Sequence, residues 1–322
     1  MKVSVMMITY NHERFIAQAL ESVLAQRVNF DYEIVIGEDC STDRTREILV
    51  DFHRRYPGKI VMQLRERNIG AMRNFKATLA ACRGEYIALL EGDDYWISED
   101  KLQRQADFLD SHSDYAISCH RARVLDETGT WEHGSVFPSK PSDTYTISDL
   151  LEGNFIMTCS TVYRRNAIGQ LPGWFSKMSL GDWPLCALIA RRGKIALMDD
   201  VMTVYRVHSG GIWSTRPELH RHRETIRMLK ALDKHLEFEY TSTIQRTIAR
   251  YRDYAVGAYL GMARTAREEG NRKATAEHIA GWVRNGGLRR AGSVRVFGSF
   301  AAYALFGSWY EAIQKARRAS RS

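Results

Sequence analysis

Paired cysteines are missing from the sequence, and their absence excludes a disulfide-stabilised scaffold. The 322 residues include five cysteines, and no two of them form a CxxC pair. An odd, dispersed set predicts free thiols in a reducing compartment and argues against a cysteine-type zinc site. The five are Cys40, Cys82, Cys119, Cys159 and Cys186. With 44% hydrophobic and 26% charged residues, the composition is that of a folded globular protein and excludes a disordered chain.

Long apolar runs are also missing. A membrane-spanning helix needs about 20 predominantly apolar residues, and no uncharged stretch of that length is present. The mostly apolar segment Met1–Ile8 is too short for the core of a signal peptide, and no small-residue cleavage site follows it. We therefore expect a cytoplasmic protein.

Positive charge is concentrated in the last third of the chain. From Thr215 onward there are 21 Lys and Arg residues against 10 Asp and Glu, whereas the preceding part has 25 basic and 28 acidic residues. This asymmetry predicts an anionic partner for the C-terminal region, such as lipid headgroups, nucleic acid or a polyanionic substrate.

The first hundred residues alternate between strand and helix patterns. Four runs of β-branched or apolar residues, which we expect to be strands, are separated by segments whose apolar residues have helical spacing. The four runs are Lys2–Ile8, Tyr32–Ile36, Lys59–Leu64 and Tyr86–Leu90. Four such repeats predict an α/β fold with a mostly parallel sheet covered by helices on both faces. Gly84 lies where a left-handed glycine would end the third helix.

The second hundred residues show a looser pattern. We expect helices at Lys101–Ser111 and Pro184–Arg192, and strands at the segments Tyr115–Leu125, Thr158–Tyr163, Ile195–Met198 and Met202–Val207. After Trp213 the pattern is helical. The predicted organisation is one α/β domain at residues 1–214, followed by a basic helical region at 215–322.

Polar residues follow the predicted strands, at the edge where parallel α/β sheets bind ligands. Glu91-Gly92-Asp93-Asp94 places three carboxylates within four residues, and a hard cation such as Mg²⁺ or Mn²⁺ would relieve their repulsion. The alternative is an acidic turn that caps the following helix.

Two further clusters follow the first and second strands. Thr9, Tyr10 and Asn11 offer hydrogen bonds and a stacking ring to a nucleoside, although Asn11 would also serve as a helix cap. Glu38 and Asp39 could accept hydrogen bonds from a ribose or a base, while Ser41 or Asp43 caps the next helix.

Together these motifs resemble glycosyltransferase family 2. The resemblance covers roughly residues 1–215 and rests on four motifs in the family's order. They are Val3–Asn11, Glu33–Asp43 with its Glu-Asp-Cys-Ser-Thr-Asp core, Asn68-Ile69-Gly70, and Glu91-Gly92-Asp93-Asp94. Glu38 and Cys40 replace the aspartate and glycine usual in the second motif, and Glu91 replaces the first aspartate of the last.

The resemblance implies a GT-A fold and an inverting transfer from a nucleotide-diphosphate sugar, with Mn²⁺ or Mg²⁺ as cofactor. Residues 1–97 would then be the nucleotide-sugar half and 98–214 the acceptor half. The implied nucleotide-sugar contacts are Thr9, Tyr10, Asn11, Glu38, Asp39, Asn68, Gly70, Asp93 and Arg206. The implied metal ligands are Glu91, Asp94 and His208.

An inverting transfer also needs a general base on the acceptor side. Asp182, in Gly181-Asp182-Trp183, resembles the family's base, and its alternative role is to cap the Pro184 helix. We interpret His12 and Arg67 as surface or pocket-rim residues, and Trp183 and Trp213 as candidate sugar platforms or core residues.

Two other functions remain open from the residues alone. A sugar-phosphate nucleotidyltransferase would need a glycine-rich phosphate loop after the first strand, which Thr9–His12 does not provide. A nucleic-acid-binding protein would use the basic helices after Thr215, where no recognised module is found, so we expect no nucleic acid partner.

The C-terminal region contains an uncharged segment, Val296–Tyr310, with basic residues on both sides. The flanking residues are Arg289, Arg290, Arg295, Lys315, Arg317, Arg318 and Arg321. The segment is too short to span a bilayer but suits an interfacial helix, with a core helix as the alternative. We expect an enzyme of cell-surface glycan synthesis with a glycan or lipid-linked acceptor, peripheral on the inner face of the plasma membrane.

Overall fold

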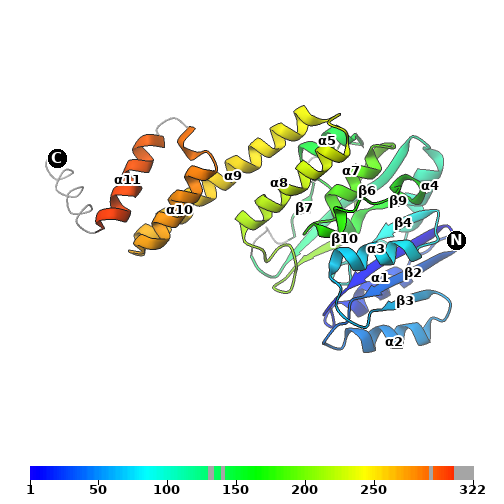
Figure 1. The fold of residues 1–322 in the computed structure, drawn as a ribbon. Helices are drawn as coiled ribbons and strands as arrows, with labels where there is room; N and C mark the ends of the chain where they lie inside the picture. The colour runs from blue at the N-terminus through cyan, green and yellow to red at the C-terminus, as the bar shows by residue number, and fades with distance from the viewer. Residues whose placement is uncertain (130–133, 139–141, 290–292, 308–322) are drawn as a thin grey trace. The chain divides into compact units, whose positions relative to one another are not determined.

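The computed structural model describes residues 1–129, 134–138, 142–289 and 293–307 (Figure 1). The chain divides into two compact units. The first contains Met1–Thr215 and Lys234–Thr243, and the second contains Arg216–Asp233 and the chain from Ile244 onward.

The first unit begins with the predicted alternation of strands and helices. Its elements are β1 (Val3–Thr9), α1 (Ile16–Leu24), β2 (Tyr32–Glu38), α2 (Thr45–Arg55), β3 (Ile60–Leu64), α3 (Ala71–Ala81) and β4 (Tyr86–Leu89). Every residue of β2 and β4 is buried, so both faces of the sheet are covered, as continuous apolar strands require.

The rest of the unit extends the same sheet. Its elements are β5 (Tyr95–Trp96), α4 (Lys101–Ser111), β6 (Tyr115–Asp126), β7 (Val136–Phe137), β8 (Thr144–Tyr145), α5 (Ile147–Glu152), η1 (Thr158–Ser160), β9 (Val162–Arg164), α6 (Arg165–Ile168), η2 (Phe175–Lys177), α7 (Asp182–Ala190) and β10 (Lys194–Val207). The predicted mixed α/β class with a mostly parallel sheet is confirmed.

The strand order is β3-β2-β1-β4-β9-β6-β10-β5, with β7 paired to β6 and β8 to β10. Strand β1 is parallel to β2 and β4, β2 is parallel to β3, and β10 is parallel to β6. Because β9 is antiparallel to both β4 and β6, these two strands run in the same direction. The carboxyl ends of β1, β2, β4, β6 and β10 therefore lie at one edge of the sheet.

Two expected strand boundaries were wrong. Thr158–Ser160 forms a 3-10 turn, and only Val162–Arg164 pairs as strand β9. The two strands expected at Ile195–Met198 and Met202–Val207 are one strand, β10. Its register against β6 shifts between Met198 and Thr203, so a bulge interrupts the alternation without ending the strand.

Gly84 has a different role from the predicted left-handed helix end. The glycines with left-handed φ angles do not include Gly84, and α3 ends at Ala81. A Cβ on Gly84 would lie 2.3 Å from the backbone nitrogen of Ser4, and the Gly84 N–H donates to the Ser4 hydroxyl at 2.7 Å. Glycine is needed here because two backbone segments approach closely.

The second unit is helical, as predicted. Its elements are α8 (Glu218–His235), α9 (Thr241–Glu268), α10 (Arg272–Arg284), η3 (Gly287–Arg289) and α11 (Ser293–Phe306). The last two residues of α8 and the first three of α9 belong to the first unit. Val256 and Tyr259 of α9 pack with Trp282 of α10, and Phe300 of α11 packs with Ala263 and Ile279.

The predicted uncharged helix forms α11, which ends at Phe306. The last residues of the predicted segment and most of its basic flanks lie outside the described residues; these are Arg290, Ser308–Tyr310, Lys315, Arg317, Arg318 and Arg321. Among the helices of the described chain, none combines the length and apolarity that crossing a bilayer demands.

We predict that Gly84→Ala destabilises the first unit by about 2 kcal/mol, because overpacking against backbone is not relieved by a rotamer change. For a unit of this size, the melting temperature would fall by about 4–8 °C. Thermal unfolding followed by circular dichroism measures this. Gly173→Ala is the control, since nothing lies within 4 Å of its Cβ position. Equal melting temperatures for the two variants would contradict the prediction.

Candidate active site

A short crossover strand assembles the candidate site. After β4 the chain passes β9 and β6 and pairs with β10 as β5, with Tyr95 opposite Val204 and Trp96 opposite Thr203. The residues just before β5 therefore lie beside the last residues of β10. This register brings the acidic loop 91–94 to Arg206 and His208, which are more than a hundred positions away in the sequence.

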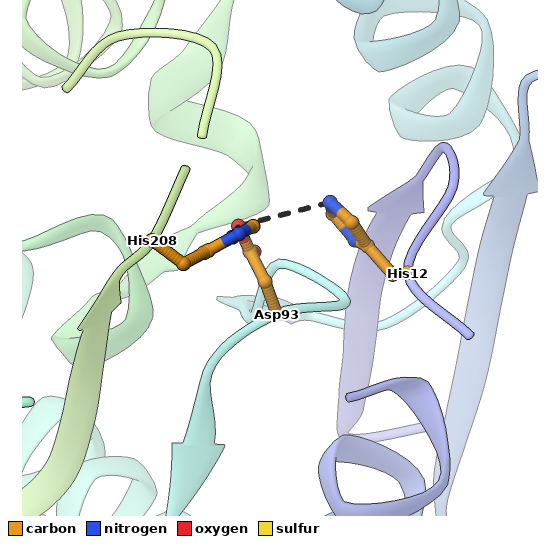
Figure 2. A group of neighbouring side chains, drawn as sticks. All are labelled: His12, Asp93 and His208. Carbon is orange, nitrogen blue, oxygen red and sulfur yellow. Dashed lines mark hydrogen bonds and ion pairs between the residues drawn. The ribbon is translucent and has the colours of Figure 1, made fainter. Parts of the chain in front are cut away.

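Figure 2 shows His12, Asp93 and His208 pointing toward one another. The Asp93 Oδ2 atom lies 3.1 Å from His208 Nε2 and 3.7 Å from His12 Nε2. One ligand atom from each residue lies within 4.8 Å of the other two. Two imidazoles and one carboxylate can bind a divalent cation while leaving coordination positions open for a substrate.

The loop that holds Asp93 depends on Gly92. A Cβ at this position would lie 2.7 Å from Thr9 Oγ1 and 2.9 Å from His12 Nδ1. Both of these atoms are buried, and neither has a hydrogen-bond partner among the described residues. The loop after β1 and the acidic loop thus meet without an intervening side chain, which brings His12 to Asp93.

The carboxylates of the acidic loop differ in pKa. Burial and the charges of Asp94 and Asp93 raise the pKa of Glu91, and burial and the charge of Asp93 raise that of Asp94. Burial opposes ionisation of Asp93 as well, but His12 and His208 outweigh it and lower the Asp93 pKa. Burial also lowers the pKa of His12, which favours its neutral, ligand-competent form. Asp93 is therefore the carboxylate most ready to bind a cation.

Asp94 and Arg206 hold the loop in place. Asp94 Oδ1 accepts from the Arg206 backbone N–H at 2.8 Å. The Arg206 Nε donates to the Asp93 carbonyl at 2.8 Å, and its guanidinium lies 4.8 Å from the Phe15 ring and 5.0 Å from the Tyr95 ring. Of the three predicted metal ligands, His208 lies beside Asp93. Asp94 bonds the backbone of β10 instead, and Glu91 lines a small cavity beside Leu89 and Leu90.

The residues predicted for the nucleoside lie at the ends of β1 and β2. Asn11 has a left-handed backbone, with φ 56°, and accepts from the Thr42 N–H at 2.8 Å, so it joins two loops rather than capping α1. Thr9 is buried and Tyr10 is exposed. The Ser41 hydroxyl accepts from the Asn11 N–H at 3.0 Å.

Both acidic residues at the end of β2 already have protein partners. Glu38 is fully buried, accepts from the Ser41 N–H at 2.5 Å and forms an ion pair with Arg46. The Asp39 carboxylate accepts from the N–H groups of Ile69 and Gly70 at 2.8 and 2.9 Å. Asn68 and Gly70 are thereby held beside β2, and the nucleoside role of these residues stays a prediction.

Asp182 is the first residue of α7, two residues earlier than the helix start expected at Pro184. Burial raises its pKa. The Asn154 amide donates to Asp182 Oδ2 at 3.1 Å. Asp182 lies near enough to Glu91 for its charge to raise the Glu91 pKa.

For Trp183 and His12 the structure decides between the alternatives that the sequence left open. Trp183 is not available as a sugar platform, because it is 3% exposed and its indole N–H donates to the Leu150 carbonyl. His12 is not a surface residue, because it is packed against Asp93, Phe15 and His208. The position of His12 directly after Thr9-Tyr10-Asn11, at the end of a strand, was the sequence feature that could have indicated a place in the site.

Comparisons with known proteins identify the family. The model of "Glycosyl transferase family 2" matches residues 4–171. The Mycobacterium tuberculosis protein Rv1520 is 41% identical over 212 residues, which are 65% of this chain and 60% of that protein. TuaG of Bacillus subtilis, named as a teichuronic acid biosynthesis glycosyltransferase, is 30% identical over 66% of this chain and 82% of its own length. The chain thus spans less than two thirds of the mycobacterial relative.

Solved structures show the same fold. The structure of S. aureus TarS 1–349 in complex with UDP-GlcNAc matches with a TM-score of 0.63 and 19% identity, over 94% of this chain and 91% of that one. The mannosyltransferase PcManGT of Pyrobaculum calidifontis, in complex with GDP-Man and Mn²⁺, matches with a TM-score of 0.57 and 15% identity, over 98% and 83%. The GT-A fold is therefore shown, and the chain belongs to glycosyltransferase family 2.

Proposed function

We propose that this protein is an inverting glycosyltransferase that transfers a sugar from a nucleotide-diphosphate sugar to an acceptor hydroxyl in the synthesis of a cell-surface or lipid-linked glycan. The observation that carries the proposal is the His12–Asp93–His208 cluster at the carboxyl ends of the strands. Asp182 follows Gly181, which packs against Met72 just after the Asn68–Gly70 motif. The names of TuaG and TarS, a teichuronic acid glycosyltransferase and a poly(ribitol-phosphate) N-acetylglucosaminyltransferase, support a polymeric acceptor.

A divalent cation would be held by His12, Asp93 and His208, and we propose Mn²⁺ rather than Mg²⁺. Two of the three ligand atoms are imidazole nitrogens, whereas Mg²⁺ prefers oxygen ligands. The Mn²⁺ bound by PcManGT is consistent with this choice. When bound, the cation would neutralise the charge of the diphosphate leaving group.

Asp182 would act as the general base. The acceptor hydroxyl oxygen attacks the anomeric carbon from the face opposite the diphosphate, and its proton passes to the Asp182 carboxylate. The bond from the anomeric carbon to the diphosphate oxygen breaks in the same step, which inverts the configuration at that carbon. The raised pKa of Asp182 makes its carboxylate a stronger base than an exposed aspartate.

We predict that His12→Ala, Asp93→Asn and His208→Ala each lower the affinity for Mn²⁺ more than about tenfold, because each removes one ligand atom of three. Electron paramagnetic resonance of free Mn²⁺ during a titration measures this without any substrate. Asp31→Asn, an exposed carboxylate of the same unit, is the control. Unchanged Mn²⁺ binding in all three variants would exclude the cluster as the metal site.

We predict that Asp182→Asn lowers kcat by about two to four orders of magnitude while nucleotide-sugar binding is retained. UDP-, GDP- and dTDP-sugars, tested with Mn²⁺ by thermal shift, identify the donor, and release of the nucleotide then measures turnover. Since the base must be ionised, wild-type turnover should fall as the pH drops through the Asp182 pKa, which lies above the usual value of about 3.9. Near-wild-type turnover of Asp182→Asn would show that another residue is the base.

We also propose that α11 binds an anionic membrane surface. Phe300 and Tyr303 face the helical unit, whereas Val294, Phe297, Leu305 and Phe306 are exposed, with Val294 at 77% and Leu305 at 68%. Exposed apolar side chains next to Arg289 and Arg295 fit a surface of lipid headgroups, because each basic residue near such a surface contributes about 1 kcal/mol.

The double variant Val294→Ser/Leu305→Ser should lose flotation with vesicles containing anionic phospholipid, at an unchanged melting temperature. Ile97→Ser, which removes an exposed apolar side chain of the first unit, should float like the wild type. A wild-type protein that does not float would refute membrane binding, and a collapsed melting temperature of the double variant would assign these side chains to the core.

A further inference from the structure

We infer that Asn154 is a positioning residue for Asp182: its side-chain amide binds one carboxylate oxygen and so sets the direction in which the carboxylate faces the acceptor hydroxyl. The inference deepens the proposed function and rests on it. Asn154 lies outside the motifs that resemble the family, in the segment between α5 and η1.

The orientation of the Asn154 amide is fixed from both ends. Its Oδ1 accepts from the Ile156 backbone N–H at 3.1 Å, and its Nδ2 donates to Asp182 Oδ2 at 3.1 Å. A flipped amide would turn its NH₂ group toward the Ile156 N–H and its oxygen toward the carboxylate, which are two repulsive contacts. The donor therefore has one favourable direction, toward Asp182.

The backbone that carries Asp182 is fixed as well. A Cβ on Gly181 would lie 2.5 Å from Met72 Sδ, so the start of α7 packs closely on α3. With the backbone held there and Oδ2 bound by Asn154, the remaining freedom of the carboxylate is small. The backbone N–H groups of Asp182 and Trp183 also hydrogen-bond the carboxylate, so it is held from the start of α7 as well as by Asn154.

The titratable groups that the charge of Asp182 influences lie on the acidic loop and on α7. Glu91, on the acidic loop, and the Cys186 thiol, one turn further along α7, both experience the charge of Asp182. A negative charge on either group would add to the effect of burial, which raises the pKa of Asp182. The backbone N–H groups of Trp183 and Asp182 and the Asn154 amide lower this pKa. Loss of the Asn154 donor should consequently shift the ionisation of Asp182 to higher pH.

The experiment compares Asn154→Ala, Asn154→Asp and the exposed control Asn166→Ala with the wild type. Nucleotide release from UDP-GlcNAc and from GDP-mannose with Mn²⁺ is followed across pH. For Asn154→Ala we expect kcat to fall about tenfold to a hundredfold, as for a slightly misplaced catalytic group, with KM for the donor unchanged. The acid limb of the pH profile should move to higher pH. Asn154→Asp retains the oxygen that accepts from Ile156 N–H, so it keeps the loop while removing the donor.

An Asn154→Ala variant with a lower melting temperature but a wild-type pH profile would overturn the inference, because Asn154 would then only hold its own loop. Carboxyl ¹³C NMR titration supplies a readout that needs no substrate, with the Asp182 signal identified by its loss in Asp182→Asn. A raised Asp182 pKa in Asn154→Ala supports the inference, and an unchanged one rejects it, whereas the charge added by Asn154→Asp would raise this pKa by itself. If the wild type releases nucleotide from neither donor, the proposed activity toward them fails, while the NMR titration still decides the role of Asn154.

Discussion

The pairing of β5 with β10 is the constraint on which the rest of the site depends. Only two residues, Tyr95 and Trp96, form this strand, yet their register against Thr203 and Val204 determines which side chains meet. A shift of one residue would turn every side chain of the short strand to the opposite face. Asp94 would then lose its hydrogen bond from the Arg206 N–H, and Asp93 would no longer lie beside His208.

Repulsion among the carboxylates of the acidic loop opposes the pairing of β5 with β10 when no cation is bound. Glu91, Asp93 and Asp94 repel one another in a loop from which water is largely excluded, and burial raises the pKa of the first and the last. The two histidines and the N–H of Arg206 offset part of the repulsion. The Arg206 guanidinium, packed between Phe15 and Tyr95, adds a fixed positive charge behind the loop. The arrangement resembles a site that a divalent cation completes.

The close approach of chain segments at two glycines is the second constraint on the geometry of the site. Gly92 and Gly181 have no room for a Cβ, and each lies next to a residue with a proposed role, Asp93 and Asp182. Neither glycine has a left-handed backbone, so their use here is steric rather than conformational. The same is true of Gly84 at the opposite edge of the sheet, where β4 begins against the backbone of β1.

The sequence alone determined the α/β class, the first four strands and the edge of the sheet where the site lies. Apolar periodicity and strand-end polar clusters are local signals, and parallel strands bring their carboxyl ends together in any order. The resemblance to glycosyltransferase family 2 rested on the same clusters. The bulged strand β10 and the turn at Thr158 were misread, because a bulge breaks the alternation from which strands are predicted.

Only the tertiary structure decided which side chains of those clusters face one another. His12 joined Asp93 because Gly92 lets two loops touch, and Asp39 turned to the N–H groups of Ile69 and Gly70. Asn154 carries no sequence signal, since its contact with Asp182 spans 28 residues and a loop of irregular backbone. Such contacts depend on distances between segments, which periodicity and motif order do not contain.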